Sequence, residues 1–258
     1  MSDEPVPAEV DSEEEIPEEH PRYQDLVTRH RIEVGVEKGI THLQGMHAEG
    51  RGSAFDYLLG ERTIESAREA ERAAAAALLL AERPVISVNG NVAALAPRET
   101  VELAEVVGAA IEVNLFNRTP ERLNAIVSHL REHGAEEVLG LAADASVPGL
   151  NHERAKVDRE GIFAADVVLV PLEDGDRAEA LSKLGKTEIV IDLNPLSRSP
   201  QVADIPIVDN LIRALPNVTE HTRSLRNASE AELEAIVEGF DAEAALADAE
   251  HVIRTGLR

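Results

Sequence analysis

Two short apolar runs late in the chain each end in polar side chains that could bind a ligand. Asp192 and Asn194 follow the run that begins at Ile189, and Asp209 and Asn210 follow the next one. In an open parallel sheet, loops at the carboxyl ends of strands converge on the crevice where ligands bind. These groups predict a binding edge whose favoured ligand class is a nucleotide or an anionic metabolite.

The loop after Ile191 carries the groups best suited to a nucleotide. Asp192 can accept hydrogen bonds from ribose hydroxyls, and Asn194 can bind a ribose or the edge of a base. Arg198 offers two parallel donors to phosphate or carboxylate, and Ser199 adds a hydroxyl. Helix capping is the alternative role for Asp192, although the lack of an immediate helix weakens it.

Asn89-Gly90-Asn91 follows an earlier strand-like run and allows two interpretations. Asn-Gly is a favoured pair in tight turns that need positive φ, so the sequence can be a plain turn. Alternatively, its amides and the side chains of Asn89 and Asn91 face a ligand, which is the interpretation that we favour.

Asn114 and Arg118 end the second strand-like run, and Thr119-Pro120 begins a helix directly after them. An Arg beside the free amides of a helix N-terminus can form an anion site. A surface Arg118 that is paired with Glu121 is the alternative.

Asp174 and Asp176 follow a strand-like run and are separated by one glycine. Two carboxylates across such a turn could hold Mg²⁺ through water molecules. Alternatively, Asp176 only caps the helix that begins at Arg177.

Arg29 and Arg51 are basic residues of the front segment of an otherwise acidic chain. The glycines on either side of Arg51 allow its backbone to approach a ligand closely, which favours a role on an anion. No residues show the pattern of a nucleophilic triad, so the sequence identifies no catalytic residue.

Two familiar nucleotide motifs are absent. Residues 180–187 nearly match a P-loop, but the first position is Ala180, and Lys186-Thr187 leads into a strand where a P-loop needs a helix. Gly185 is better explained as a helix C-cap. The single glycine after the first strand also does not make the three-glycine dinucleotide fingerprint, which removes the usual support for NAD.

Composition restricts the class of protein further. The 258 residues suffice for one large α/β domain, and the absence of Cys excludes disulfides, zinc thiolate sites and cysteine nucleophiles. No apolar run approaches the roughly 20 residues that span a bilayer, and the N-terminus lacks the pattern of a signal peptide. We therefore expect a cytoplasmic protein without a membrane partner.

The formal charge of −24 predicts a protein from a high-salt cytoplasm, where salt screens the self-repulsion of an acidic surface. An acidic surface for a basic partner is the alternative. Nucleic acid is excluded as a partner because no basic stripe exists to release its counterions.

Alternating β and α patterns predict an α/β fold: a Rossmann-like, doubly wound, mostly parallel sheet with helices on both faces and an added N-terminal helical segment. Strand-like runs lie at 85–89, 110–115, 137–141, 166–172, 187–193 and 205–209, and helical patterns lie at 20–39, 64–81, 98–107, 119–133, 177–184 and 210–226. Gly39 to Gly60 is predicted to be a glycine-punctuated connection, and Thr63 is predicted to cap the helix that follows it.

The expected organisation is an acidic disordered tail at 1–19, followed by a single domain at 20–258. That domain comprises a helical part at 20–82, a Rossmann-like core at 83–226 and a C-terminal helix at 227–258. The small-residue faces of Ala73–Ala77 and of the C-terminal helix are candidate dimer surfaces, with packing inside the chain as the alternative.

Six long motifs occur in order and resemble those of the archaeal phosphopantothenate synthetase family, also called 4-phosphopantoate–β-alanine ligase. The resemblance covers about residues 17–245, which leaves the acidic tail outside it. Its motifs are His20-Pro-Arg-Tyr, Gly50-Arg-Gly-x-Ala-Phe-Asp-Tyr-Leu-Leu-Gly-Glu61, Pro84–Leu95, Asn114–Arg122, Val168–Arg177 and Ile191-Asp-Leu-Asn-Pro-Leu-Ser-Arg198.

The resemblance implies a homodimer that binds ATP on a Rossmann-like sheet without either familiar motif. It also implies the synthesis of 4′-phosphopantothenate from 4-phosphopantoate, β-alanine and ATP in coenzyme A biosynthesis, with release of AMP and diphosphate. The implied ATP contacts fall on Arg29, Arg51, Asp192, Leu193, Asn194, Arg198, Ser199, Asn210 and Leu211.

On this basis, Arg51 and Arg198 are expected to bind the ATP phosphates, and Asp192 and Asn194 the adenosine. Asp174 or Asp176 is expected to hold Mg²⁺. The residues expected to hold 4-phosphopantoate are Asn89, Asn91, Asn114 and Arg118. Two other classes stay open: a nicotinamide-dependent oxidoreductase on the same fold, and a non-catalytic module that senses a nucleotide.

Overall fold

The computed structural model describes residues 16–17, 19–20, 22–172 and 175–256. The predicted tail at 1–19 therefore lies almost entirely outside the described residues, and so does Asp174.

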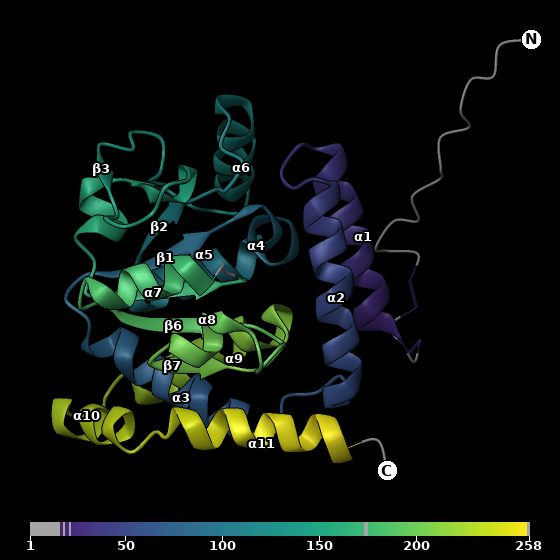
Figure 1. The fold of residues 1–258 in the computed structure, drawn as a ribbon, viewed down its shortest axis with the longest axis vertical. Coiled ribbons are helices and arrows are strands. Elements are labelled where there is room, and N and C mark those ends of the chain that lie inside the picture. The colour runs from purple at the N-terminus through teal and green to yellow at the C-terminus, as the bar shows by residue number, and fades with distance from the viewer. Residues whose placement is uncertain (1–15, 18, 21, 173–174, 257–258) are drawn as a thin grey trace, which may run out of the picture.

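Five parallel strands form the central sheet in the order β2-β1-β5-β6-β7 (Figure 1). All five are buried along all or most of their length, as expected for apolar runs covered on both faces. The bounds are β1 Pro84–Val88, β2 Ala110–Val113, β5 Val167–Pro171, β6 Thr187–Ile191 and β7 Ile205–Ile207. A separate antiparallel pair joins β3 (Ala145–Ser146) to β4 (Lys156–Val157).

Helices cover both faces of this sheet, because alternate residues of each strand point to opposite sides. Ile86 and Leu169 join one apolar core with α3, α5, α6 and α9, whereas Val85 and Val168 join a second core with α7. The bounds are α3 Glu65–Leu80, α5 Pro97–Val107, α6 Pro120–Glu132, α7 Gly175–Lys183 and α9 Leu211–Leu225. The predicted α/β architecture is confirmed.

The N-terminal segment forms two helices, α1 (Tyr23–Glu37) and α2 (Leu43–Leu59), which stand side by side at one edge of the molecule (Figure 1). The prediction of a connection at Gly39 to Gly60 is wrong, because α2 occupies most of it. Gly45 and Gly52 allow this helix to pack closely, since a Cβ at Gly45 would lie 2.3 Å from Asn91 Oδ1. Tertiary packing thus overrides the low helix propensity of glycine.

Three local predictions need correction. Residues 137–141 contribute a single parallel bridge, from Leu139 to Glu112, in place of a strand. The C-terminal helix is two helices, α10 (Glu230–Glu238) and α11 (Ala242–Thr255). Thr63 does not cap α3, because its hydroxyl donates instead to Asp209 Oδ2 at 2.6 Å.

Ala73–Ala77 is almost completely buried within the chain, where α3 packs against α9 and α10. The alternative of packing inside the chain therefore holds for this run, which has no exposed face left for a dimer. Within the described residues, no helix is both long and apolar enough to cross a membrane.

Candidate active site

A cleft of about 700 Å³ opens at the carboxyl ends of the strands, with α2 forming its far wall. The strand order places β2 on one side of β1 and β5 on the other, so the chain changes direction between β1 and β5. Ligands bind at such a switch point in open α/β sheets. Three helices begin at the cleft: α4 (Gly90–Leu95), α8 (Arg198–Val202) and α9. Helix N-termini favour an anion.

At the β6 end of the cleft, the Asp192 carboxylate organises its own loop. It accepts hydrogen bonds from Asn194 N at 2.9 Å and from the Ser197 hydroxyl at 2.6 Å. Burial raises the pKa of Asp192, against these hydrogen bonds and the charge of Arg51. Leu193, Asn194 and Ser199 line the same end.

The two Arg residues predicted to bind phosphate both line the cleft. Arg51 projects from α2, and Arg198 starts α8 and donates to Glu179 Oε1 at 2.5 Å. Arg198 keeps 66% of its side-chain surface exposed, so this ion pair leaves it open to a second anion. The tertiary structure therefore brings together side chains that are well over a hundred residues apart in sequence.

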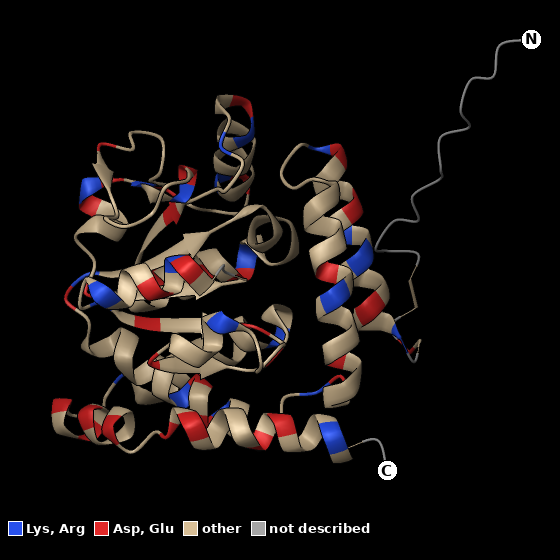
Figure 2. Cartoon of the chain, in the orientation of Figure 1, with Lys and Arg blue, Asp and Glu red and all other residues tan. Residues whose placement is uncertain are grey.

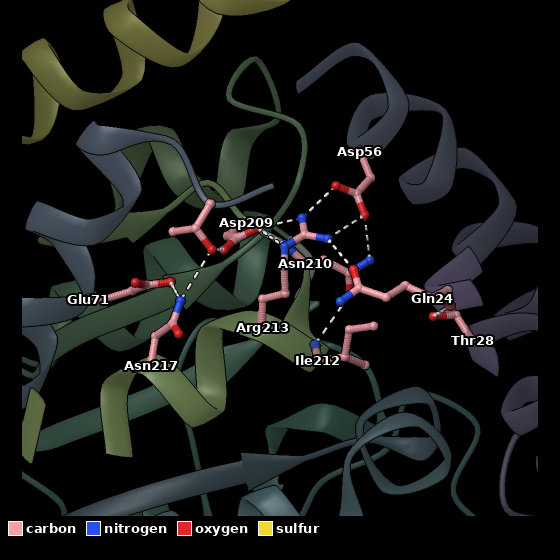
Figure 3. Close-up of polar contacts among 10 residues, drawn as sticks. Gln24, Thr28, Asp56, Glu71, Asp209, Asn210, Ile212, Arg213 and Asn217 are labelled. Atoms are coloured by element: carbon pink, nitrogen blue, oxygen red, sulfur yellow. Dashed lines mark hydrogen bonds and ion pairs between the residues drawn. The ribbon is translucent and has the colours of Figure 1, made fainter. Parts of the chain in front are cut away.

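Asn210 and Leu211 reach the cleft from the start of α9. Asn210 caps α9 by accepting from Ile212 N at 3.2 Å, and it donates to Asp56 Oδ2 of α2 at 2.8 Å. Arg213 completes the connection with Nη2 at 2.5 Å from Asp56 Oδ1 and Nε at 2.9 Å from Asp209 Oδ1 (Figure 3). We call Asp56, Asp209, Asn210 and Arg213 the docking cluster, because it fastens α2 to the sheet.

Asn89 and Asn91 line the cleft, but their side chains also hold the backbone. Asn89 caps α4 and donates to the carbonyls of Pro171 and Leu172, both at 3.1 Å, which ties the end of β1 to the end of β5. Asn91 accepts from Thr41 and donates to the Gly45 carbonyl of α2 at 2.9 Å.

The tight turn at Asn89-Gly90 is not present, because α4 begins at Gly90 and φ there is not positive. Glycine is required for space: a Cβ would lie 2.4 Å from Arg122 Nη2 and 2.5 Å from the Ile40 carbonyl oxygen.

Asn114, Arg118 and Arg29 are not among the residues that line the cleft. Asn114 is fully buried and donates to the carbonyls of Arg154 and Lys156, whereas Arg118 donates to the Gly140 carbonyl at 2.5 Å. Arg29 lies on α1, where it pairs with Asp25.

Two other Arg residues, which the motif analysis did not single out, form the β2 end of the cleft. Arg122, in the first turn of α6, donates to the carbonyls of Ile40 and Asn117 at 3.1 and 3.2 Å. Burial and the charge of nearby Arg154 lower the pKa of Arg122. Two guanidinium groups that repel each other in a cleft would be relieved by an anion. The position of Arg122 in the first turn of a helix that follows a strand was the available signal.

Neutral polar side chains line the same end of the cleft. Asn117 Nδ2 lies 2.9 Å from His42 Nε2 and 3.5 Å from Gln44 Oε1, and all three residues line the cleft. Burial and the charge of Arg122 lower the pKa of His42, which favours its neutral form.

The predicted Mg²⁺ ligands do not form a metal site in the described part of the chain. Asp176 is exposed and pairs with His152 Nε2 at 3.0 Å, and it does not line the cleft. No group of three or more His, Asp or Glu among the described residues is placed to hold a metal ion.

Sequence comparison identifies the family. Residues 66–256 match the sequence profile described as phosphopantothenate/pantothenate synthetase. The chain belongs to this family.

Three relatives are similar to this chain over most of its length. The 4-phosphopantoate–β-alanine ligase of Thermococcus onnurineus is 58% identical over 227 residues, which is 88% of this chain and 87% of the relative. The ligase of the same name from Thermococcus kodakarensis is 56% identical, with 90% of each chain covered. The one from Methanosarcina mazei is 54% identical over 95% of this chain and 96% of its own.

The charge distribution of this family member fits an anionic ligand in the cleft. Figure 2 shows acidic segments along α10 and α11, on the opposite side of α3 from the sheet, whereas α1 and α2 carry segments of both signs. Although the net charge of the chain is −24, the cleft is lined by Arg51, Arg122, Arg154 and Arg198 against the two acids Glu49 and Asp192.

Proposed function

We propose that this chain is an ATP-dependent ligase that condenses 4-phosphopantoate with β-alanine to 4′-phosphopantothenate, with release of AMP and diphosphate, in coenzyme A biosynthesis. The observation that carries the proposal is its 54–58% identity, over 88–95% of the chain, to ligases of that name. The cationic cleft supports it, because two of the three substrates carry phosphate.

The chemistry requires activation of a carboxylate, which is a poor acyl donor to an amine. Attack of the 4-phosphopantoate carboxylate on the ATP α-phosphate gives a mixed anhydride with AMP and releases diphosphate. The amine of β-alanine then displaces AMP. Negative charge builds on phosphoryl oxygens first and on a carbonyl oxygen second, and fixed donors at those positions stabilise both steps.

ATP is proposed to occupy the β6–β7 end of the cleft. Asp192, Leu193 and Asn194 would hold the adenosine, and Asn210 and Leu211 would bound it from the start of α9. Arg51, Arg198 and the Ser199 hydroxyl would bind phosphate oxygens, since they lie at the start of α8 or face it from α2. Arg29 would have to leave Asp25 to take part.

4-Phosphopantoate is proposed to occupy the β1–β2 end. Arg122 and Arg154 would hold its phosphate with the help of His42 and Asn117, which replaces the role that the motifs suggested for Asn114 and Arg118. Asn89 and Asn91 would bound the site and keep it in shape. Mg²⁺ would enter as the complex with ATP, because the described residues offer no metal site of their own.

The homodimer implied by the family resemblance is also a proposal, and light scattering in molar KCl tests it. A monomer under these conditions would refute it without affecting the proposed reaction.

The decisive test is AMP release by the purified protein in molar KCl with ATP, Mg²⁺, 4-phosphopantoate and β-alanine, omitting each in turn. AMP that forms only in the complete mixture supports the ligase. AMP formed equally well from pantoate would change the assigned substrate. ATP binding without AMP release in any mixture would refute the ligase in favour of a sensing module.

A further inference from the structure

Glu49 occupies the middle of the cleft wall. It lies on α2 four residues after Gly45 and three before Gly52, so the three residues share one face of the helix. Gly45 faces Asn91 at the β1 end, whereas a Cβ at Gly52 would lie 3.4 Å from Leu193 Cδ1 at the β6 end. Glu49 itself lines the cleft between these two contacts.

The Glu49 carboxyl group is buried and uncompensated. Only 9% of the residue is exposed, and no hydrogen bond or ion pair joins its side chain to any residue that the structure describes. Burying an acid without a partner is costly, so such groups are uncommon outside functional sites. Burial, followed by repulsion from Asp56, raises the pKa of Glu49 to about 7.

The charged groups around Glu49 come from several elements. Arg51 and Asp56 lie on α2 itself, Asp192 lies at the end of β6, and Arg213 on α9 binds Asp56. From α1, Arg31 donates to the Leu95 carbonyl, and α4 carries no titratable side chain. In the described structure, none of these groups forms a hydrogen bond or ion pair with the Glu49 carboxylate.

The proposed function places the reacting atoms beside this residue, and the inference rests on that function. With the nucleotide at the β6–β7 end and the phosphate of 4-phosphopantoate at the β1–β2 end, the acyl group and the α-phosphate meet between them. That meeting point lies against the middle of α2. β-Alanine must reach the same point, and at neutral pH its nitrogen is an ammonium without a lone pair.

We propose that Glu49 is the general base of the second step, in which its carboxylate takes a proton from the β-alanine ammonium. The freed lone pair forms the C–N bond at the acyl carbon. The bond from that carbon to the AMP oxygen then breaks, and its electron pair stays on the AMP phosphate. The nitrogen loses its second proton to that phosphate, which leaves a neutral amide. Before the transfer, the same carboxylate attracts and orients the ammonium.

The test is Glu49→Gln, which keeps the size of the side chain and removes the base. Adenylate formation is measured by 4-phosphopantoate-dependent exchange of diphosphate into ATP, and the complete reaction by AMP release with β-alanine. We expect exchange to stay within about threefold of the wild type, whereas AMP release falls by about 10²–10⁴-fold. With hydroxylamine, an acceptor that is already neutral at pH 7, the variant and the wild type should react at similar rates.

The pH profile gives a second readout. Wild-type AMP release with β-alanine should fall below about pH 7, where Glu49 becomes protonated. The rate of Glu49→Gln should instead keep rising with pH as the free amine of β-alanine becomes more abundant. A purely structural role for Glu49 would not change the shape of the profile.

Glu71→Gln is the matched control. Glu71 is also buried, and burial raises its pKa to about 8, but it lies on α3 outside the cleft. All three rates should be unchanged in this variant. Equal loss of exchange, β-alanine and hydroxylamine activity in Glu49→Gln would overturn the proposal, as would an unchanged β-alanine rate. A wild type that releases no AMP would refute the proposed ligase itself, which is a different outcome.

Discussion

Two carboxyl groups on α2, two turns apart, have opposite electrostatic surroundings. Asp56 belongs to the docking cluster, and Glu49 lies at the centre of the cleft. Asp56 is buried and receives both nitrogens of the Arg213 fork as well as the Asn210 amide. Glu49 is equally buried but receives no donor in the described structure. A compensated charge of this kind stabilises the position of α2, whereas an uncompensated one is available for a substrate.

The other polar residues of the site also divide into those that hold the structure together and those that are available to a ligand. Asn89 and Asn91 use their amides on the backbone and on α2, so they shape the cleft. Arg51 and Arg198 expose guanidinium groups to it. Substitutions in the docking cluster should therefore cost stability first, and substitutions in the cleft should cost activity first.

The largest effect is expected from breaking the docking cluster with Arg213→Met. Removal of this cation leaves Asp56 and Asp209 buried without their partner, which typically costs about 3–5 kcal/mol. Urea unfolding in KCl should show this loss, and activity should fall because α2 carries one wall of the cleft. Arg223→Met is the control on the same helix, since its ion pair with Glu102 is exposed and should be worth about 0–1 kcal/mol. Equal losses in the two variants would contradict the role of the cluster.

Arg122→Lys tests the β2 end of the cleft. It keeps the charge but loses the fork that suits phosphate, so KM for 4-phosphopantoate should rise about tenfold or more while KM for ATP is unchanged. Arg118→Lys is the matched variant at the residue that the motifs favoured, and its KM values should be those of the wild type. A larger effect at Arg118 than at Arg122 would reverse the assignment.

Arg198→Ala tests whether a residue at the proposed nucleotide end of the cleft contributes to activity and not to stability. The free energy of unfolding should stay close to that of the wild type, because the ion pair with Glu179 is exposed. kcat/KM for ATP should nevertheless fall about tenfold or more, as expected for loss of a charged hydrogen bond to phosphate. An unchanged kcat/KM for ATP would remove Arg198 from the phosphate site.

The smallest expected effect is a pH dependence of stability caused by Glu71. This residue lies beyond the docking cluster and accepts a hydrogen bond from Asn217 at 3.1 Å (Figure 3). Its folded pKa is raised from 4.5 to about 8, so between these values the folded state binds more protons than the unfolded state. The stability of the wild type should therefore fall as pH rises through this window.

Glu71→Gln abolishes that titration. Relative to the wild type, the variant should match it near pH 5 and become more stable by on the order of 1–3 kcal/mol by pH 9. Unfolding curves at several pH values measure the difference, and a difference that does not change with pH would mean that Glu71 is ionised in the folded protein.

Much of the fold could be predicted because its signals are local. Runs such as Val167–Pro171 are aliphatic without alternation, which is the pattern of a strand covered on both faces, and Thr119-Pro120 marks a helix start. Asp192, Asn194 and Asn210 follow β6 and β7 and were correctly expected at the cleft, because the carboxyl ends of parallel strands share one edge. Asp209 does not line the cleft and binds Arg213 instead.

The α2 helix could not be predicted, since its glycines disfavour a helix in isolation. Their advantage is visible only once Asn91 and Leu193 lie against them. The same holds for Arg118 and Arg122, which are only four residues apart in sequence. Whether a guanidinium faces the cleft or a carbonyl outside it depends on where α6 sits beside β2.

The sequence alone thus determined the parallel sheet, the edge at which the cleft lies and the family, because hydrophobic periodicity and contiguous motifs are properties of neighbouring residues. The tertiary structure decided which polar groups stabilise the fold and which remain available to bind a substrate. Asp56 and Glu49 lie seven residues apart on one helix and differ only in what the rest of the chain brings to them. That difference arises from long-range contacts, which cannot be read from residue type and spacing along α2.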